Sequence, residues 1–79
     1  MEITSFIVNF AAQFEDSDIS KFTPKTNFKI EIEEWDSLIS LSVIAMVDEK
    51  YGIVIKGEDI NNSKTIEDLF LIVKQKYEQ

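Results

Sequence analysis

The chain has 79 residues, which is near the lower limit for a domain that folds around one apolar core without disulfides or metals. It contains no cysteine and no histidine, which excludes disulfides, thiolate metal sites and imidazole-based catalysis. Fifteen acidic and eight basic residues give a net charge of −7, which disfavours nucleic acids and anionic membranes and favours basic protein partners.

The N-terminus lacks the cationic segment of a secretory signal, and no apolar run is long enough to span a membrane. No internal repeat or low-complexity tract divides the sequence. We therefore expect a single soluble, cytoplasmic and monomeric domain that covers residues 1–79.

The first half of the chain predicts one helix followed by a long connection. Apolar residues recur with helical spacing from Ile3 to Phe14 and predict a helix over about residues 2–15. Residues 16–35 break this pattern and predict an ordered loop with room for one helical turn. The alternation within residues 28–32 imitates a β-strand, but a lone strand without a partner is unstable. Apolar residues expected to pack this loop onto the core are Ile19, Phe22, Phe28, Ile30, Ile32 and Trp35.

The second half predicts two longer helices with a short turn between them. A helix is predicted from Ser37 to about Tyr51, and Gly52 suits the left-handed position after its end. An extended stretch and a brief helical turn near residues 58–62 should follow. Thr65 and Asp68 resemble a capping box that begins the last helix, whose apolar stripe is expected to comprise Ile66, Leu69, Phe70, Val73 and Tyr77.

The helix predicted from Ser37 is apolar on nearly all sides. Val47, with Ile44 and Tyr51, lies opposite a face that carries Leu41, with Leu38 and Ala45. Either this helix is central, or one apolar face is kept for a ligand or a partner. A bundle this small can hardly bury a helix on every side, so we assign the Val47 side to the core and the Leu41 side to partners.

The residues offer little chemistry of their own. A serine hydrolase needs a base beside its nucleophile, and no lysine lies in a recognisable motif around Ser37. The acidic segments lack the glycine and the final glutamate of a calcium loop. We expect no catalytic residue, no metal site and no enzymatic activity.

Ser37 lies where the loop gives way to the second helix, so it is either a capping residue or an attachment point for a phosphorylated group. The run Asp36-Ser37-Leu38 resembles the D-S-L attachment motif of acyl carrier proteins. Residues 48–55 resemble that family's E-E-x-F-G-I-x-I helix ending, and residues 65–69 resemble its T-[IV]-x-D opening of the final helix. The resemblance covers essentially the whole chain.

The resemblance implies an all-α carrier domain, an antiparallel four-helix bundle with a short third helix and a long loop between helices 1 and 2. A phosphopantetheinyl transferase would attach 4′-phosphopantetheine from coenzyme A to Ser37, between the flanking Asp36 and Leu38. This phosphoprotein would carry acyl groups as thioesters to ligases, synthases or acyltransferases of fatty-acid, lipid or specialised biosynthesis. The residues expected to meet the basic docking surfaces of these enzymes are Leu41, Ala45, Glu49, Glu58 and Asp59.

The sequence departs from the fatty-acid-synthesis type at several positions on the expected partner side. They are Trp35, Ile39, Ser42, Gly57 and Asn61, and four of them replace residues that are typically acidic in that subgroup. A dedicated pathway is therefore at least as well supported as general fatty-acid synthesis. Two alternatives stay open: an aminoacyl or D-alanyl carrier, and an unmodified acidic interaction module that docks through the second helix.

Overall fold

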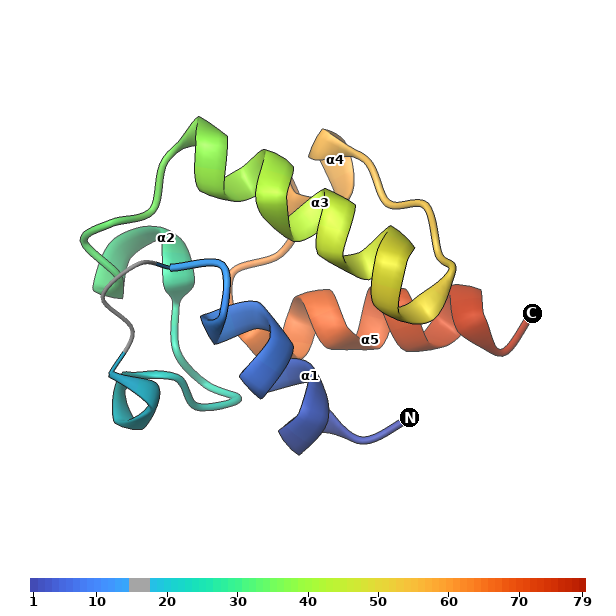
Figure 1. The fold of residues 1–79 in the computed structure, drawn as a ribbon, viewed down its shortest axis with the longest axis horizontal. Coiled ribbons are helices and arrows are strands. Elements are labelled where there is room, and N and C mark those ends of the chain that lie inside the picture. The colour runs from blue at the N-terminus through green and yellow to red at the C-terminus, as the bar shows by residue number, and fades with distance from the viewer. Residues whose placement is uncertain (15–17) are drawn as a thin grey trace.

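The structure is a computed structural model that describes residues 1–14 and 18–79, and every regular element within these residues is helical (Figure 1). The predicted all-helical class is confirmed. The elements are α1 (Ile3–Ala11), the 3₁₀-helix η1 (Ile19–Lys21), α2 (Phe28–Glu31), α3 (Ser37–Tyr51), α4 (Gly57–Asn61) and α5 (Ile66–Tyr77).

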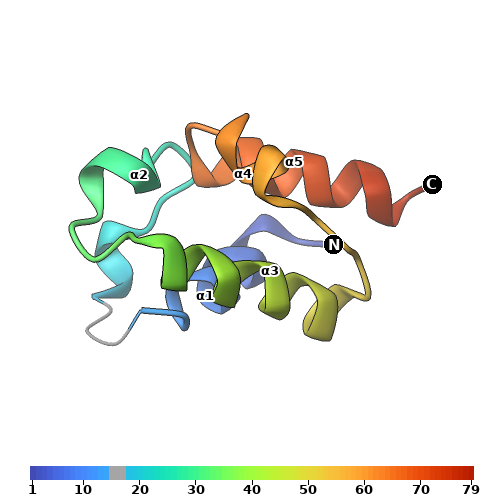
Figure 2. The same ribbon diagram turned by 90° about the horizontal axis from the view of Figure 1, so that it is seen from above.

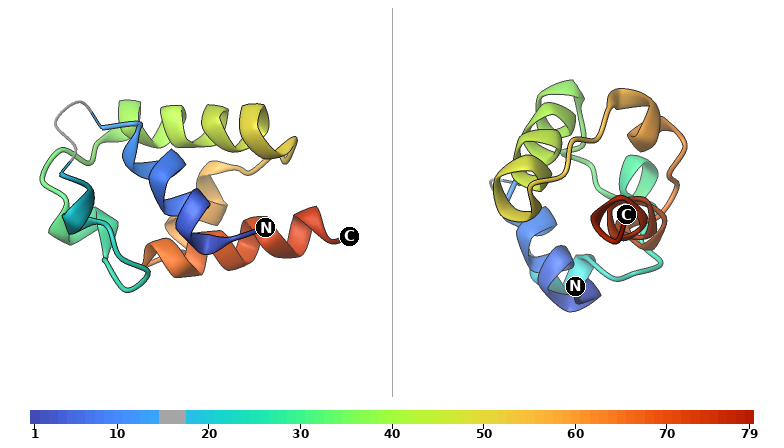
Figure 3. Two further views of the ribbon diagram at one scale, coloured as in Figure 1. Left: turned by 60° about the horizontal axis from the view of Figure 1, so that its bottom comes forward. Right: turned by 90° about the vertical axis from the view of Figure 1, so that its right-hand side faces the viewer.

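The two longest helices, α3 and α5, extend along the long axis of the molecule and run in the same direction (Figures 1 and 2). α1 packs against both of them, and it runs obliquely in the opposite sense (Figure 3). The short α4 also contacts both α3 and α5. The side chains that these helices turn inward form a single core, to which every one of them contributes.

Aromatic side chains make up a large part of this core. Phe10 of α1 lies at its centre, with neighbouring rings at centroid distances of 5.3 to 6.4 Å. Such pairs add about 0.5–1.5 kcal/mol beyond the apolar area that they bury. The rings around Phe10 are Phe6, Phe14, Phe22, Phe28 and Trp35.

α1 is shorter than the predicted helix over residues 2–15, because the chain tightens after Ala11. The amides of Gln13 and Phe14 bond three residues back, to Phe10 and Ala11, as in a 3₁₀ turn. Phe14 is nevertheless buried, so the apolar spacing that suggested a longer helix continues into this turn. Residue 15, the predicted end, lies outside the described residues.

The connection between α1 and α3 contains more helix than the sequence predicted. Besides η1 there is a full turn, α2, at the residues whose alternation imitates a strand. Phe28 and Ile32 are buried as expected, but Ile19 and Ile30 are exposed, at 50% and 80%. The prediction that these two residues pack the loop is wrong: on a one-turn helix only one face meets the core.

The elements from Ser37 onward match their predictions closely. α3 begins at Ser37 and ends at Tyr51, and Gly52 adopts the left-handed conformation with φ 66°. α4 lies within one residue of the predicted turn. The Thr65–Asp68 capping box is present at the start of α5. Tyr77 is the exception, because it lies at the last turn of α5, beyond the reach of the core, and is 53% exposed.

Candidate functional site

The candidate site is the beginning of α3, where Asp36 is the N-cap and Ser37 is the first helical residue. Asp36 Oδ1 accepts a hydrogen bond from the Ile39 amide at 2.8 Å. By helix geometry, the amides of Ser37 and Leu38 have no intrahelical acceptor and add to the positive end of the helix dipole. The sequence left open whether Ser37 is itself the cap. Asp36 performs that role, and the exposed Ser37 hydroxyl does not.

Trp35 anchors the chain to the core just before this helix. Its ring lies nearly parallel to that of Phe10, at an interplanar angle of 8°, and meets Phe28 edge-on with the centroids 4.7 Å apart. Its amide donates to the Ile32 carbonyl oxygen at 3.1 Å. The residue two positions before Ser37 is therefore anchored in the aromatic core, as the interpretation of Trp35 as a loop anchor expected.

The predicted partner residues of α3 share one exposed face with Ser37. Leu38 is 72% exposed and Leu41 is 62% exposed, and Ala45 and Glu49 continue the same face toward the end of the helix. We call these five residues the outer face of α3. Its opposite side meets the core through Val43, Met46 and Val47, with Ile44 and Tyr51 partly buried at the edge. The predicted orientation of the helix is correct.

Acidic residues lie at the end of α3, where the helix dipole disfavours them. Asp48 and Glu49 are both exposed in the last turns, and only Lys50 there carries the favoured positive charge. Each unfavourable acid costs about 0.3–1 kcal/mol at low salt. The end of α3 therefore presents two negative charges and one positive charge to the solvent.

The two predicted partner residues of α4 differ in their surroundings. Glu58 is exposed, and α4 itself contacts α3. Asp59 is engaged within the fold: its Oδ2 accepts a hydrogen bond from the Lys56 amide at 2.9 Å and lies 3.8 Å from Lys76 Nζ. Its side chain is only 18% exposed. Glu58 is thus the acid of α4 that presents an open charge, while Asp59 joins the start of α4 to α5.

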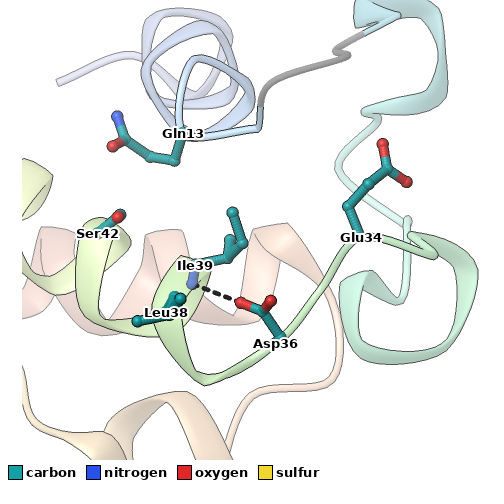
Figure 4. A pocket seen from close by; sticks show the side chains of 6 residues that line it. All are labelled: Gln13, Glu34, Asp36, Leu38, Ile39 and Ser42. Carbon is teal, nitrogen blue, oxygen red and sulfur yellow. Dashed lines mark hydrogen bonds between the residues drawn. The ribbon is translucent and has the colours of Figure 1, made fainter.

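A surface hollow of about 550 Å³ lies beside Ser37, between the end of α1 and the first turns of α3 (Figure 4). Gln13 lies across from the helix, held by a hydrogen bond from its Nε2 to the Asn9 carbonyl oxygen at 3.0 Å. The lining combines carboxylates, an amide, a hydroxyl and aliphatic groups from three separate segments: Gln13, Glu34, Asp36, Leu38, Ile39 and Ser42.

Sequence reasoning did not identify this hollow. Asp36, Ile39 and Ser42 are three residues apart on one helix and would mark a common face, but nothing in the sequence predicts that Gln13 and Glu34 face it. The close approach of α1 to α3 brings Gln13 there, and the turn before Asp36 places Glu34. Only tertiary packing assembles the site.

Within residues 1–14 and 18–79, no three acidic side chains are grouped as metal ligands. Nor does that part of the chain contain a helix with both the length and the apolar character needed to cross a membrane. Comparisons of the sequence and structure with protein-family models, with curated proteins and with solved structures returned no match.

Proposed function

We propose that the protein is an acyl carrier protein that is modified on Ser37 with 4′-phosphopantetheine. The observation that carries the proposal is the exposed hydroxyl of Ser37 on the first residue of a 15-residue helix whose cap is supplied by Asp36. Ser37 is exposed at the helix start and does not serve as the cap, so its hydroxyl is available for attachment of a phosphorylated group. The D-S-L context and the matching helix ending and capping box support the same reading.

The local electrostatics fit a phosphodiester at this position. The unpaired amides of Ser37 and Leu38 and the positive end of the α3 dipole favour a negative charge beside the Ser37 hydroxyl. In the loading step, Ser37 Oγ bonds to phosphorus as a P–O bond of the coenzyme A pyrophosphate breaks. Adenosine bisphosphate leaves, and the hydroxyl proton passes to the transferase. The arm's terminal thiol would then carry acyl cargo as a thioester.

The outer face of α3 is the proposed docking surface for the transferase and for enzymes that load or use the cargo. Leu38 and Leu41 supply apolar contact next to Ser37, and Glu49 with Glu58 supplies negative charge for basic partners. In the arrangement proposed, α1, α3, α4 and α5 are the four helices of a carrier domain over residues 1–79, and α4 is the short third helix.

Loading by a broad-specificity transferase with a fluorescent coenzyme A analogue tests the proposal. We expect one equivalent of label in the native chain, none in Ser37→Ala, and a near-native rate in Ser40→Ala, a matched serine from the same helix. Circular dichroism of each variant controls for folding. If the native chain stays unlabelled while a known carrier is labelled in parallel, the result would contradict the proposal and favour the unmodified interaction module.

A further inference from the structure

We propose that Trp35 is a positioning residue for the loading of Ser37, an inference that rests on the proposed modification of that serine. Its ring packs against α1 and α2 and thereby holds the Ser37 hydroxyl in one place for the transferase. Trp35 acts through the backbone that joins it to Ser37 two positions later, and not by contact with coenzyme A.

Trp35 is the only residue from Glu33 to Leu38 whose side chain packs on the core. It is partly buried, whereas the other five side chains of this stretch are exposed. After Ser37, the first side chain to reach the core is that of Ile39. The bond from the Ile39 amide to Asp36 closes the first turn of α3 but does not fix that turn to the rest of the fold. Because helix ends fray, the position of Ser37 depends on the anchor that precedes it.

The contacts of Trp35 restrain its ring in two directions. The ring lies parallel to that of Phe10, at an interplanar angle of 8° and a centroid distance of 6.3 Å. It meets Phe28 edge-on, at 66° and 4.7 Å. Phe10 and Phe28 are completely buried, so neither can move unless the close-packed core rearranges. The Trp35 amide also donates to the Ile32 carbonyl oxygen at 3.1 Å, which restrains the backbone.

The link from this anchor to the reacting oxygen is short. The Cα atoms of Trp35 and Ser37 are at most about 7 Å apart. Asp36 between them is extended, with φ −154° and ψ −176°, and its carboxylate is held by the Ile39 amide. In the loading step Ser37 Oγ bonds to phosphorus as the pyrophosphate P–O bond opposite it breaks, adenosine bisphosphate leaves and the hydroxyl proton passes to the transferase. A displacement of about 1 Å in such a step can cost about a hundredfold in rate.

The far end of α3 provides a matched aromatic contact. The ring of Tyr51, the last residue of α3, lies 5.9 Å from that of Phe6 on α1, and its hydroxyl accepts a hydrogen bond from Asn9 Nδ2 at 2.9 Å. Tyr51 is about 20 Å from Ser37 along the helix axis. Loss of the Tyr51 contact should therefore weaken the packing of α3 on α1 without displacing Ser37.

Steady-state loading kinetics, with the carrier chain as the varied substrate, test the proposal at a temperature where circular dichroism shows each chain fully folded. In Trp35→Leu we expect kcat to fall by about tenfold or more, because the hydroxyl is no longer held in place. KM should stay within about twofold of native, because the outer face of α3 is unchanged. Trp35→Phe keeps a ring against Phe10 and should retain most of the native kcat. Tyr51→Leu should keep the native kcat.

Amide ¹⁵N relaxation of the unmodified chain measures the restraint itself. We expect order parameters of about 0.85 for Trp35 and Ser37 in the native chain. The value for Ser37 should fall in Trp35→Leu and stay unchanged in Tyr51→Leu. The native values and Trp35→Phe decide the question even if Trp35→Leu does not fold.

Three results would overturn the proposal. One is a rise in KM at constant kcat, which would mean that Trp35 contacts the transferase. The second is an equal loss of kcat in Trp35→Leu and Tyr51→Leu, which would reduce Trp35 to a general packing residue. The third is a native order parameter for Ser37 below about 0.6, typical of a flexible backbone. A native chain that is never loaded would instead overturn the proposed function, whatever the relaxation of Ser37 shows.

Discussion

At the start of α3, one side chain caps the helix and the next is exposed to solvent. The Asp36 carboxylate holds the Ile39 amide, and the Ser37 hydroxyl is exposed. Helix-start residues of both types are common in proteins, so the sequence alone could not assign the two roles. Their separation means that Ser37, the proposed modification site, can be changed without loss of the helix cap.

Asp36→Ala is expected to destabilise the fold by about 0.5–2 kcal/mol, the usual cost of losing an N-cap side chain. Ser37→Ala should change stability by no more than about 0.5 kcal/mol, as is typical of exposed positions. Urea unfolding followed by circular dichroism measures both. Equal destabilisation by the two variants would show that Ser37 contributes to the cap.

Ionisation of Asp68, at the start of α5, makes the stability of the fold depend on pH. Its carboxylate accepts hydrogen bonds from the amides of Thr65, at 3.1 Å, and Lys64, at 3.0 Å. These bonds hold the pKa of Asp68 below its ordinary value, and the bond from Thr65 has the largest effect. Desolvation of the carboxylate acts in the opposite direction. Because the folded pKa is lower than the unfolded one, ionised Asp68 favours the folded state above the unfolded pKa. That contribution is lost as the pH falls through the folded pKa.

We therefore expect the stability difference between the native chain and Asp68→Asn to shrink as the pH falls below about 4, near the unfolded pKa of an aspartate. Urea midpoints measured from neutral to acid pH give this difference directly. Glu33→Gln, which removes a charge from an exposed turn, serves as the control for the change in net charge. A difference for Asp68→Asn that stays constant into the acid range would contradict the assignment.

At the scale of the element, α3 has one buried and one exposed apolar face. Val47 is completely buried, and a charge there has no accessible solvent or partner. Leu41 is largely exposed beside Ser37, so a charge there stays hydrated in the free protein. An introduced charge should therefore lower the stability of the fold at Val47 and weaken the proposed binding of partners at Leu41.

Val47→Asp is expected to cost several kcal/mol, which is comparable to the whole stability of so small a domain, and to unfold it or nearly so. Leu41→Glu should keep a cooperative thermal transition but slow the loading of Ser37, because it places a charge at the centre of the docking surface. Leu71→Glu on α5, at another exposed leucine, is the control and should be loaded at the native rate. A Leu41→Glu variant that is unfolded, or one that is loaded normally, would contradict the assignment of the outer face.

The sequence predicted the helices from Ser37 onward well because each carries its own end signals. Gly52 ends α3, and the Thr65–Asp68 box begins α5. The connection before Asp36 was predicted only in outline, as an ordered loop with room for one helical turn, because α2 is a single turn held by tertiary contacts such as that of Phe28 with Phe10. The hollow beside Ser37 could not be predicted for the same reason, since it depends on how α1 meets α3.

At the scale of the whole molecule, the net charge of −7 acts over distances set by salt. The longest dimension is 33 Å. At about 0.01 M salt the screening length is roughly 30 Å, so nearly all charges act together on an approaching partner. At about 0.15 M it is roughly 8 Å, and only the charges nearest the docking surface still matter.

The rate at which a basic transferase loads Ser37 should therefore fall steeply as salt rises over this range. Glu49→Gln should weaken that dependence, because it removes a charge on the outer face. Glu2→Gln, at the N-cap of α1, removes an equal charge that is not part of the outer face of α3 and should change the dependence less. A loading rate that is indifferent to salt, with the transferase stable throughout, would argue against electrostatic steering.

Intact mass spectrometry after incubation with coenzyme A and a broad-specificity phosphopantetheinyl transferase tests the central claim most directly. We expect the native chain to gain the mass of one phosphopantetheine, fragmentation to place it on Ser37, and Ser37→Ala to gain nothing. A native chain that gains no mass, while a known carrier protein in the same tube is fully converted, would rule out the proposed carrier function, and a Ser37→Ala chain that gains mass would show that Ser37 is not the attachment site.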